Sequence, residues 1–268
     1  MLDRINVLFT GGLDSSYTMM YFSKFPVEIQ PYYLKDNRPS ESYELKAIKD
    51  IITDIRKKPD TRANIRELFT KPTYAIKPDR EIQNAYRYMF KTAGFGKQYG
   101  FIARFAKQEG IKGLFVSLVH TPFGRGNMAV RNSGGVERAE DEDMEYYYLD
   151  PEKTEKNLYT LFENVLLPPS FMRTKEEEME EMKKLGFEDS IKKTWFCYWP
   201  VNGEPCGTCP PCRDLIRDGM TWRFTKDGLR RYEEDQKVPA WRHKIRDYKL
   251  TLSDKWYELK MRSRYGSQ

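Results

Sequence analysis

The sequence predicts an α/β fold in which an open parallel sheet is followed by a four-cysteine segment and a mainly helical tail. Three observations predict it: short apolar runs alternate with helical patterns, a double glycine follows the first apolar run, and all four cysteines fall within sixteen residues. Such alternation implies right-handed crossovers and a parallel sheet. We expect an α/β domain over residues 1–190, a cysteine segment over 191–220 and a helical tail over 221–268.

The first predicted strand and its turn lie in the stretch INVLFTGGLDSSYTM. Ile5–Thr10 is short and apolar, as in a buried parallel strand, and Gly11 and Gly12 end it. Glycine lets a backbone approach a ligand, and we expect Ser15 or Ser16 to cap the helix that follows. Unpaired N–H groups at the helix start favour an anion, and nearby hydroxyls add donors: Thr10, Ser15 and Ser16.

Further strands are predicted at Val27–Leu34, Thr73–Ile76 and Gly113–Val119. The clearest helix opens at Pro39 and Ser40, ends before Pro59 and carries an apolar stripe: Leu45, Ile48, Ile52 and Ile55. A second helix is predicted over Gln98–Gln108. The charged run TKEEEMEEMKKLG predicts an exposed helix that ends at Gly186.

Three predicted strand ends meet at one crevice, because ligands of open α/β sheets bind beyond the carboxyl ends of the strands. They carry TGGLDSS, the pair Lys35 and Asp36, and His120. Lys35 and Asp36 are read either as ATP contacts or as a solvated turn. For His120 we favour a plain strand end over a proton carrier. Residues 121–143 are predicted to form a loop over the crevice, in which Arg125 and Arg131 either meet phosphates or stay solvated.

The net charge of +6 comes from 46 Lys and Arg against 40 Asp and Glu. All of this excess lies beyond residue 220, where 13 basic and 7 acidic residues occur among aromatic ones: Trp222, Phe224, Tyr232, Trp241, Tyr248, Trp256, Tyr257 and Tyr265. Interleaved basic and aromatic residues are typical of single-strand nucleic-acid binders. We favour the alternative, a helical face that packs on the body or on a second subunit of a homodimer.

The chain has no secretory signal pattern and no apolar run of membrane-spanning length. We therefore expect a cytoplasmic protein without a membrane partner.

The cysteines Cys197, Cys206, Cys209 and Cys212 are spaced C-x8-C-x2-C-x2-C, with glycines and prolines between them. They can converge on one tetrahedral centre, for which zinc is favoured because thiolates are soft ligands and a closed site suits a structural ion. An iron–sulfur cluster or a redox pair ranks lower. A reducing compartment disfavours disulfides.

The turn TGGLDSS fits neither a Walker loop, which needs a lysine, nor a G-x-G-x-x-G fingerprint. It resembles the pyrophosphate loop (PP-loop) of the ATP pyrophosphatases, S-G-G-x-D-S, with Thr10 in place of the first serine. The resemblance implies an open sheet of the adenine-nucleotide α-hydrolase type, ATP and Mg²⁺ as cofactors, and release of pyrophosphate as a substrate oxygen is adenylated. It implies ATP contacts along the loop (Thr10, Gly11, Gly12, Leu13, Asp14, Ser15 and Ser16), with Asp14 and Ser15 as the catalytic candidates.

The loop and the run FCYWPVNGEPCGTCPPCRDL, in this order, resemble the 7-cyano-7-deazaguanine synthase family across most of residues 4–217. The family carries a zinc site with this cysteine spacing. The resemblance implies that ATP activates the carboxylate of 7-carboxy-7-deazaguanine and that ammonia then forms the amide and the nitrile, as in queuosine biosynthesis.

Two segments depart from the family pattern. FGKQYGF, which includes Lys97 as a possible substrate contact, replaces an Arg-Asn-Thr segment, and TPFGRGN replaces a Tyr-Pro-Asp-Cys motif. Three alternatives therefore stay open. The activated acid could pass to a different amine on a protein or nucleic acid, as in a bacterial conflict system; the chain could modify transfer RNA; or it could be a zinc-stabilised binding subunit with a vestigial ATP site.

Overall fold

The computed structural model describes residues 2–118, 125–141 and 143–239, and it confirms the predicted α/β class. The strands of the main sheet are β1 (Arg4–Leu8), β2 (Glu28–Lys35), β3 (Asn64–Ile65), β4 (Phe69–Pro72), β5 (Leu114–Phe115) and β8 (Val165–Leu166). Their order is β3-β2-β1-β5-β8, and β4 pairs with β2 beyond β3. Every pairing within this sheet is parallel, as predicted.

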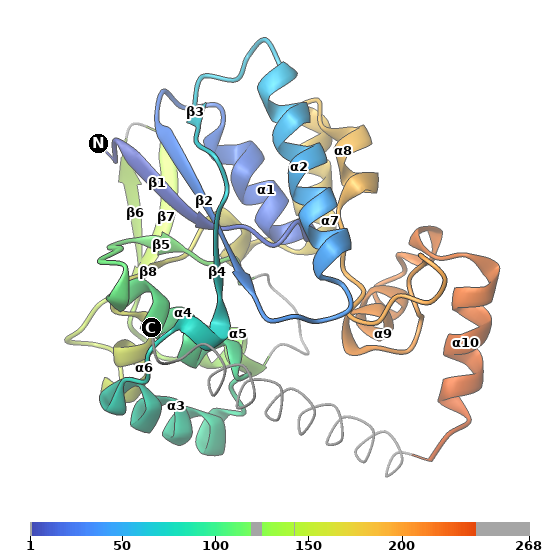
Figure 1. Ribbon diagram of the computed structural model, residues 1–268. Coiled ribbons are helices and arrows are strands. Elements are labelled where there is room, and N and C mark those ends of the chain that lie inside the picture. Colours follow the sequence, from blue (N-terminus) through green and yellow to red (C-terminus); the bar gives the residue numbers. More distant parts are fainter. Residues whose placement is uncertain (1, 119–124, 142, 240–268) are drawn as a thin grey trace.

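Helices cover both faces of the sheet (Figure 1). One face carries α1 (Leu13–Phe22), α2 (Glu41–Lys57), α7 (Lys175–Lys184) and α8 (Glu188–Lys193). The other carries α3 (Arg80–Ala93), α4 (Gln98–Gln108), α5 (Arg125–Arg131) and α6 (Lys156–Phe162). Because successive strand residues point to opposite faces, Val7 belongs to the first core and Leu8 to the second.

The predicted strand at Thr73–Ile76 is wrong. Residues Thr73–Ala75 form a 3-10 helix, and the strand is β4, which ends at Pro72. Residues Phe69–Pro72 pair in parallel with the end of β2, along the same edge as β3. After Pro72 the chain turns toward the core. Ile76 is buried beneath α3 with Ile82, so its apolar side chain fills a core instead of extending a sheet.

The predicted loop over residues 121–143 is also wrong where the structure describes it. After α5, β6 (Val136–Asp141) and β7 (Met144–Leu149) form an antiparallel hairpin. Tyr147 and Leu149 of β7 are buried, and Tyr147 pairs with Leu167 after β8. The hairpin was not predicted because glycines precede it and many of its side chains are charged, features that are typical of loops. His120 lies outside the described residues.

The charged helix α7 has the predicted bounds, with a capping box between Thr174 and Glu177, but it is not fully exposed. Glu178 and Met182 are buried, because that side of α7 packs against α1. A single buried glutamate among exposed charged residues does not produce a pattern of hydrophobic periodicity. The burial of Glu178 could therefore not be predicted from the sequence.

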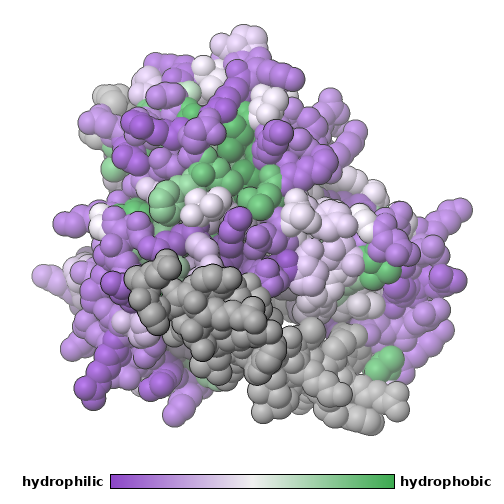
Figure 2. All heavy atoms as spheres, viewed as in Figure 1, coloured by the Kyte–Doolittle hydropathy of each residue, from purple (hydrophilic) through white to green (hydrophobic). Residues whose placement is uncertain are grey.

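The cysteine segment leads into α9 (Pro210–Arg217), a 3-10 turn (Thr221–Arg223) and α10 (Lys226–Gln236). The described part of the tail is therefore helical, as predicted. Five aromatic residues of the tail lie outside it: Trp241, Tyr248, Trp256, Tyr257 and Tyr265. Figure 2 shows mostly hydrophilic residues over α3 and α10. Among the described residues, no helix has the length and apolar character that crossing a membrane requires.

Candidate functional site

The turn after β1 lies where the strand order of the sheet reverses. From β1 the chain continues to β2 and β3 on one side, whereas β5 and β8 lie on the other. In open α/β sheets such a switch point leaves a crevice beyond the carboxyl ends of the strands, and ligands bind there. Residues 9–12, between β1 and α1, open into this crevice.

The two glycines of the turn, Gly11 and Gly12, have different structural roles. Gly11 has a φ of +71°, and a Cβ on it would lie 2.9 Å from the backbone oxygen of Glu44. Gly12 has a φ of −76° and is the N-cap of α1. A Cβ on Gly12 would meet its neighbours at 3.5 Å, an ordinary contact. Gly11 is therefore required by the fold, whereas Gly12 leaves space above the loop.

The predicted cap at Ser15 or Ser16 is wrong, because α1 begins earlier, at Leu13, and its N-cap makes no side-chain bond. The Ser16 hydroxyl donates to the Gly12 carbonyl oxygen at 2.7 Å. The Ser15 hydroxyl accepts from the Thr10 N–H at 3.3 Å and lies 3.2 Å from the Thr10 hydroxyl. These hydroxyls brace the loop from within.

The N–H groups of Leu13, Asp14 and Ser15 consequently make no hydrogen bond within the described part of the chain. Free N–H groups of a first helical turn, together with the positive end of the helix dipole, form an anion site. The predicted anion-binding character of the turn thus has a geometric basis.

A pocket of about 280 Å³ opens above this turn. The loop contributes Thr10, Gly12, Leu13, Asp14 and Ser15 to its lining. Ser117 after β5 and Gln98 at the start of α4 complete the floor. The Ser117 hydroxyl also forms a hydrogen bond with the Thr18 hydroxyl at 2.9 Å, which ties the segment after β5 to α1.

Three basic residues line the same pocket: Arg38, Lys175 and Arg223. Arg38 bonds Asp36 at 2.7 Å and lies 3.9 Å from Glu44. Burial alone would lower the pKa of Arg38, but the carboxylates of Glu44 and Asp36 raise it. This arginine is held charged at the pocket wall.

Arg223 differs from Arg38, because no carboxylate of the described residues lies within ion-pair distance of it. Its guanidinium donates to the carbonyl and the hydroxyl of Thr194 at 2.6 and 2.7 Å and stacks on Phe196 at 4.5 Å. Burial lowers its pKa to about 10, so the group stays charged at neutral pH. A charged guanidinium that is fixed at a pocket wall without an ion-pair partner among the described residues is suited to an anionic ligand.

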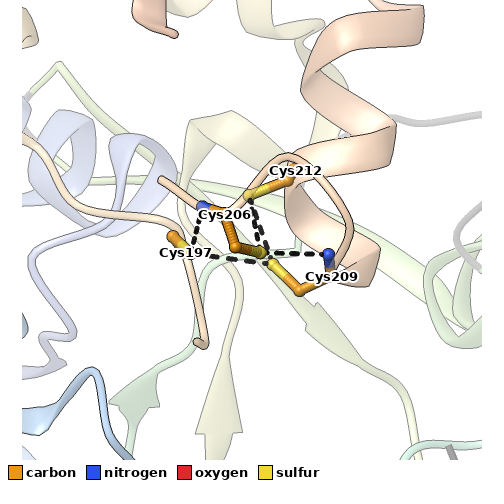
Figure 3. Close-up of side chains that lie close together, drawn as sticks. All are labelled: Cys197, Cys206, Cys209 and Cys212. Atoms are coloured by element: carbon orange, nitrogen blue, oxygen red, sulfur yellow. Dashed lines mark hydrogen bonds between the residues drawn. The ribbon is translucent and has the colours of Figure 1, made fainter. Parts of the chain in front are cut away.

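The four cysteines converge on one point (Figure 3). All are buried, none forms a disulfide, and their sulfur atoms lie within 4.8 Å of one another. The sulfur contacts range from 3.2 Å between Cys209 and Cys212, through 3.8 Å between Cys206 and Cys212, to 4.0 Å between Cys197 and Cys209. Four thiolates around zinc at about 2.3 Å would lie about 3.8 Å apart, so the donor set fits a tetrahedral zinc ion.

Backbone N–H groups support thiolates at this cluster. The N–H of Cys206 points at the sulfur of Cys197 at 3.2 Å, and those of Thr208 and Cys209 point at the sulfur of Cys206 at 3.4 and 3.3 Å. Hydrogen bonds, first from Cys197 and also from Thr208, lower the pKa of the Cys206 thiol. Such bonds stabilise ligands that must be deprotonated to hold a metal.

The cysteine segment also forms one wall of the pocket. The N–H of Trp195 donates to the carbonyl of Gly11 at 2.8 Å, and the Trp195 ring stacks on Tyr43 of α2 at 4.5 Å. Trp195, Phe196 and Tyr198 line the pocket. The conformation of the loop after β1 is thereby linked to the segment that carries the four cysteines.

The structure thus brings together most of the predicted loop residues. Gly11 and Ser16 brace the loop beneath the pocket, while Lys35 and Asp36 lie outside its lining, and their predicted contact with ATP stays a prediction. Lys35 is 3.8 Å from Glu41. Arg131 donates to the Phe171 carbonyl and stacks on that ring, which accounts for its side chain.

Sequence reasoning missed several residues that line the pocket. They come from five segments, none of which is marked by a loop motif: Glu44, Ser117, Lys175, Trp195 and Arg223. Ser117 had a signal, because it lies near the end of a predicted strand. For the others, tertiary packing supplies the proximity.

No family model matches the chain, and no curated protein matches it. Among solved structures, the chain is similar to a 4-thiouridine synthetase in complex with RNA and bound ATP, with 15% identity and a TM-score of 0.38. The matched region covers 87% of this chain and 53% of that protein, so this chain spans about half of its length. The similarity is distant, and the functional assignment rests on the geometry of the site.

Proposed function

We propose that this protein is a PP-loop ATP pyrophosphatase that adenylates a carboxylate. One observation carries the proposal: the turn after β1 lies at the switch point of the sheet and presents free N–H groups of α1 to a pocket lined by Arg38, Lys175 and Arg223. These groups suit the phosphates of ATP. Gly12 leaves room for the phosphates to approach the backbone.

In the proposed reaction, a carboxylate oxygen attacks the α-phosphorus of ATP and pyrophosphate leaves. The chain's part is mainly electrostatic: N–H groups and basic side chains hold the negative charge that moves to the leaving group. Asp14 suits Mg²⁺, because its Oδ1 is buried without a hydrogen-bond partner and carboxylate oxygens are hard ligands. The ion would neutralise phosphate charge when bound.

As acid substrate we propose a 7-deazaguanine carboxylate, with ammonia as the amine that displaces AMP. The sequence resemblance supports this choice, and the aromatic wall of Trp195, Phe196 and Tyr198 offers ring faces to a flat heterocycle. The proposed product is 7-cyano-7-deazaguanine or its amide.

The test is product analysis by mass spectrometry after incubation with ATP, Mg²⁺, ammonium and 7-carboxy-7-deazaguanine. We expect AMP together with the amide or the nitrile, and no AMP from the Asp14→Ala variant. AMP formed only when another acid or amine is added would keep the adenylation and reject this substrate. Absence of AMP with every acid tried would reject the proposed chemistry.

A second candidate is a PP-loop enzyme with a nucleic-acid acceptor, which the basic sequence of 221–268 favours. It predicts transfer RNA binding that weakens with salt and is lost when residues 240–268 are removed. Unchanged RNA binding after this truncation would reject residues 240–268 as the docking segment.

A further inference from the structure

Glu178 is a buried carboxyl group to which no described residue donates a hydrogen bond. It is 0% exposed, in the middle of α7, although its helical neighbours Glu176 and Glu177 are exposed. Both of its carboxylate oxygens lack a hydrogen-bond partner among the described residues. An unpaired buried carboxylate is strongly destabilising, so a group of this kind normally binds a proton or a cation.

The group that faces Glu178 is Asp14 of the PP-loop. The two carboxyl groups lie within hydrogen-bonding reach of each other, and Oδ1 of Asp14 is likewise buried without a partner. Burial, and then the charge of Asp14, raise the pKa of Glu178. As carboxylates, neither group can donate to the other, and their charges repel.

The nearby basic groups are bound elsewhere. Arg173 bonds Glu181 at 2.7 Å, and Lys175 lies 3.8 Å from Asp218. Arg223 interacts with the charge of Asp14 but donates to Thr194. No described basic side chain hydrogen-bonds the three unpaired oxygens of Asp14 and Glu178.

The oxygens of these two helices therefore form an incomplete set of hard ligands at the edge of the pocket that Asp14 lines. Magnesium is usually held by one or two carboxylates together with phosphate oxygens of a nucleotide. We propose that Glu178 acts with Asp14 to bind the divalent cation of the ATP site. This inference rests on the proposed function, since it assigns the ion to that site.

The test measures binding of Mn²⁺, a spectroscopic substitute for Mg²⁺, to the zinc-loaded full-length chain by electron paramagnetic resonance. Titrations are made without nucleotide and with α,β-methylene-ATP, which is not cleaved. We expect one Mn²⁺ per chain in the presence of the nucleotide. Glu178→Gln should weaken this binding at least tenfold, whereas Glu176→Gln, an equal loss of charge on the exposed side of α7, should leave it unchanged.

Thermal unfolding gives a second measurement that does not depend on activity. Without divalent ions, Glu178→Gln should unfold at a higher temperature than the wild type, because the variant removes a buried like-charge contact and its amide can donate to Asp14. Added Mn²⁺ should stabilise the wild type more than the variant.

Equal Mn²⁺ affinity in the wild type and Glu178→Gln, or no Mn²⁺ binding to the wild type in either titration, would overturn the proposal in favour of a shared proton. Measurement of AMP formation distinguishes failure of the proposed adenylation from failure of the proposed cation site. Glu178-dependent Mn²⁺ binding without AMP from any acid rejects the enzyme function and keeps the cation site. AMP formation together with Mn²⁺ binding that does not depend on Glu178 keeps the enzyme function and rejects the assigned cation site.

Discussion

At the scale of single residues, the two glycines of the loop after β1 have different roles. The fold requires a glycine at position 11, whereas at position 12 the glycine leaves space for a ligand. Gly11 needs its positive φ and its contact with the Glu44 backbone, whereas Gly12 has an ordinary φ and free space. The sequence motif S-G-G-x-D-S contains both glycines and does not distinguish their roles. Their backbone conformations show that only the first is required for folding.

Gly11→Ala should destabilise the protein by about 1–3 kcal/mol, because an L-residue is strained at this φ and its Cβ would press on backbone. Gly12→Ala should fold with nearly unchanged stability but bind ATP more weakly, since its methyl group enters the space above the loop. Urea unfolding and ATP titration measure the two effects. Equal loss of stability in both variants would contradict this division.

Arg223 is a second residue whose role depends on three-dimensional context. Arg223→Gln should lower AMP formation at least about tenfold, because hydrogen bonds to charged groups contribute about 1.5–3 kcal/mol. Arg230→Gln is the matched control, since Arg230 pairs only with exposed Asp227 among the described residues. Rates at saturating and at low ATP separate loss of binding from loss of turnover. Equal rates in Arg223→Gln and the wild type would remove Arg223 from the site.

At the scale of elements, α8 is attached to α2 by a polar contact. Lys193 and the Ser190 hydroxyl of α8 both donate to Asp54 of α2, at 2.6 and 2.7 Å. Burial alone would raise the pKa of Asp54, but these bonds outweigh burial and lower it. The folded state therefore holds the Asp54 proton less tightly than the unfolded chain does.

Because the pKa of Asp54 is lowered on folding, its contribution is complete above the unfolded value of about 3.9 and is lost as the pH falls below it. Asp54→Asn should cost about 1 kcal/mol at pH 7, after allowance for the partly exposed Lys193, and almost nothing at pH 2. Asp50→Asn on the same helix, which breaks the exposed pair with Lys46, should cost less. Unfolding free energies across this pH range test the trend, and a constant difference would refute it.

At the scale of the whole molecule, the pocket combines the three predicted parts of the chain. The glycine loop after β1 comes from 1–190, the aromatic wall from 191–220, and Arg223 from 221–268. The division into these three domains stays a prediction. The hydrogen bond between Trp195 and Gly11 makes the cysteine segment and the loop after β1 neighbours in space.

Removal of the proposed zinc ion should therefore loosen the loop of residues 10–16 as well as the cysteine segment. We expect Cys212→Ser or chelation to abolish the single bound zinc and to speed amide hydrogen exchange over residues 10–16, because Trp195 no longer holds the Gly11 carbonyl in place. Elemental analysis and exchange mass spectrometry measure both. Loss of zinc with unchanged exchange over residues 10–16 would show that the loop is independent of the cluster.

Local patterns in the sequence determined the α/β class, the strand and double glycine before α1, the bounds of α2 and α4, and the clustering of the cysteines. Each depends on residues that are close in the chain, where periodicity, turn chemistry and ligand spacing act directly. Tertiary structure alone decided that α7 brings Glu178 to Asp14, that Trp195 bonds Gly11 and that Arg223 enters the pocket. These contacts join residues far apart in the chain, and packing between elements leaves no local pattern that would reveal them.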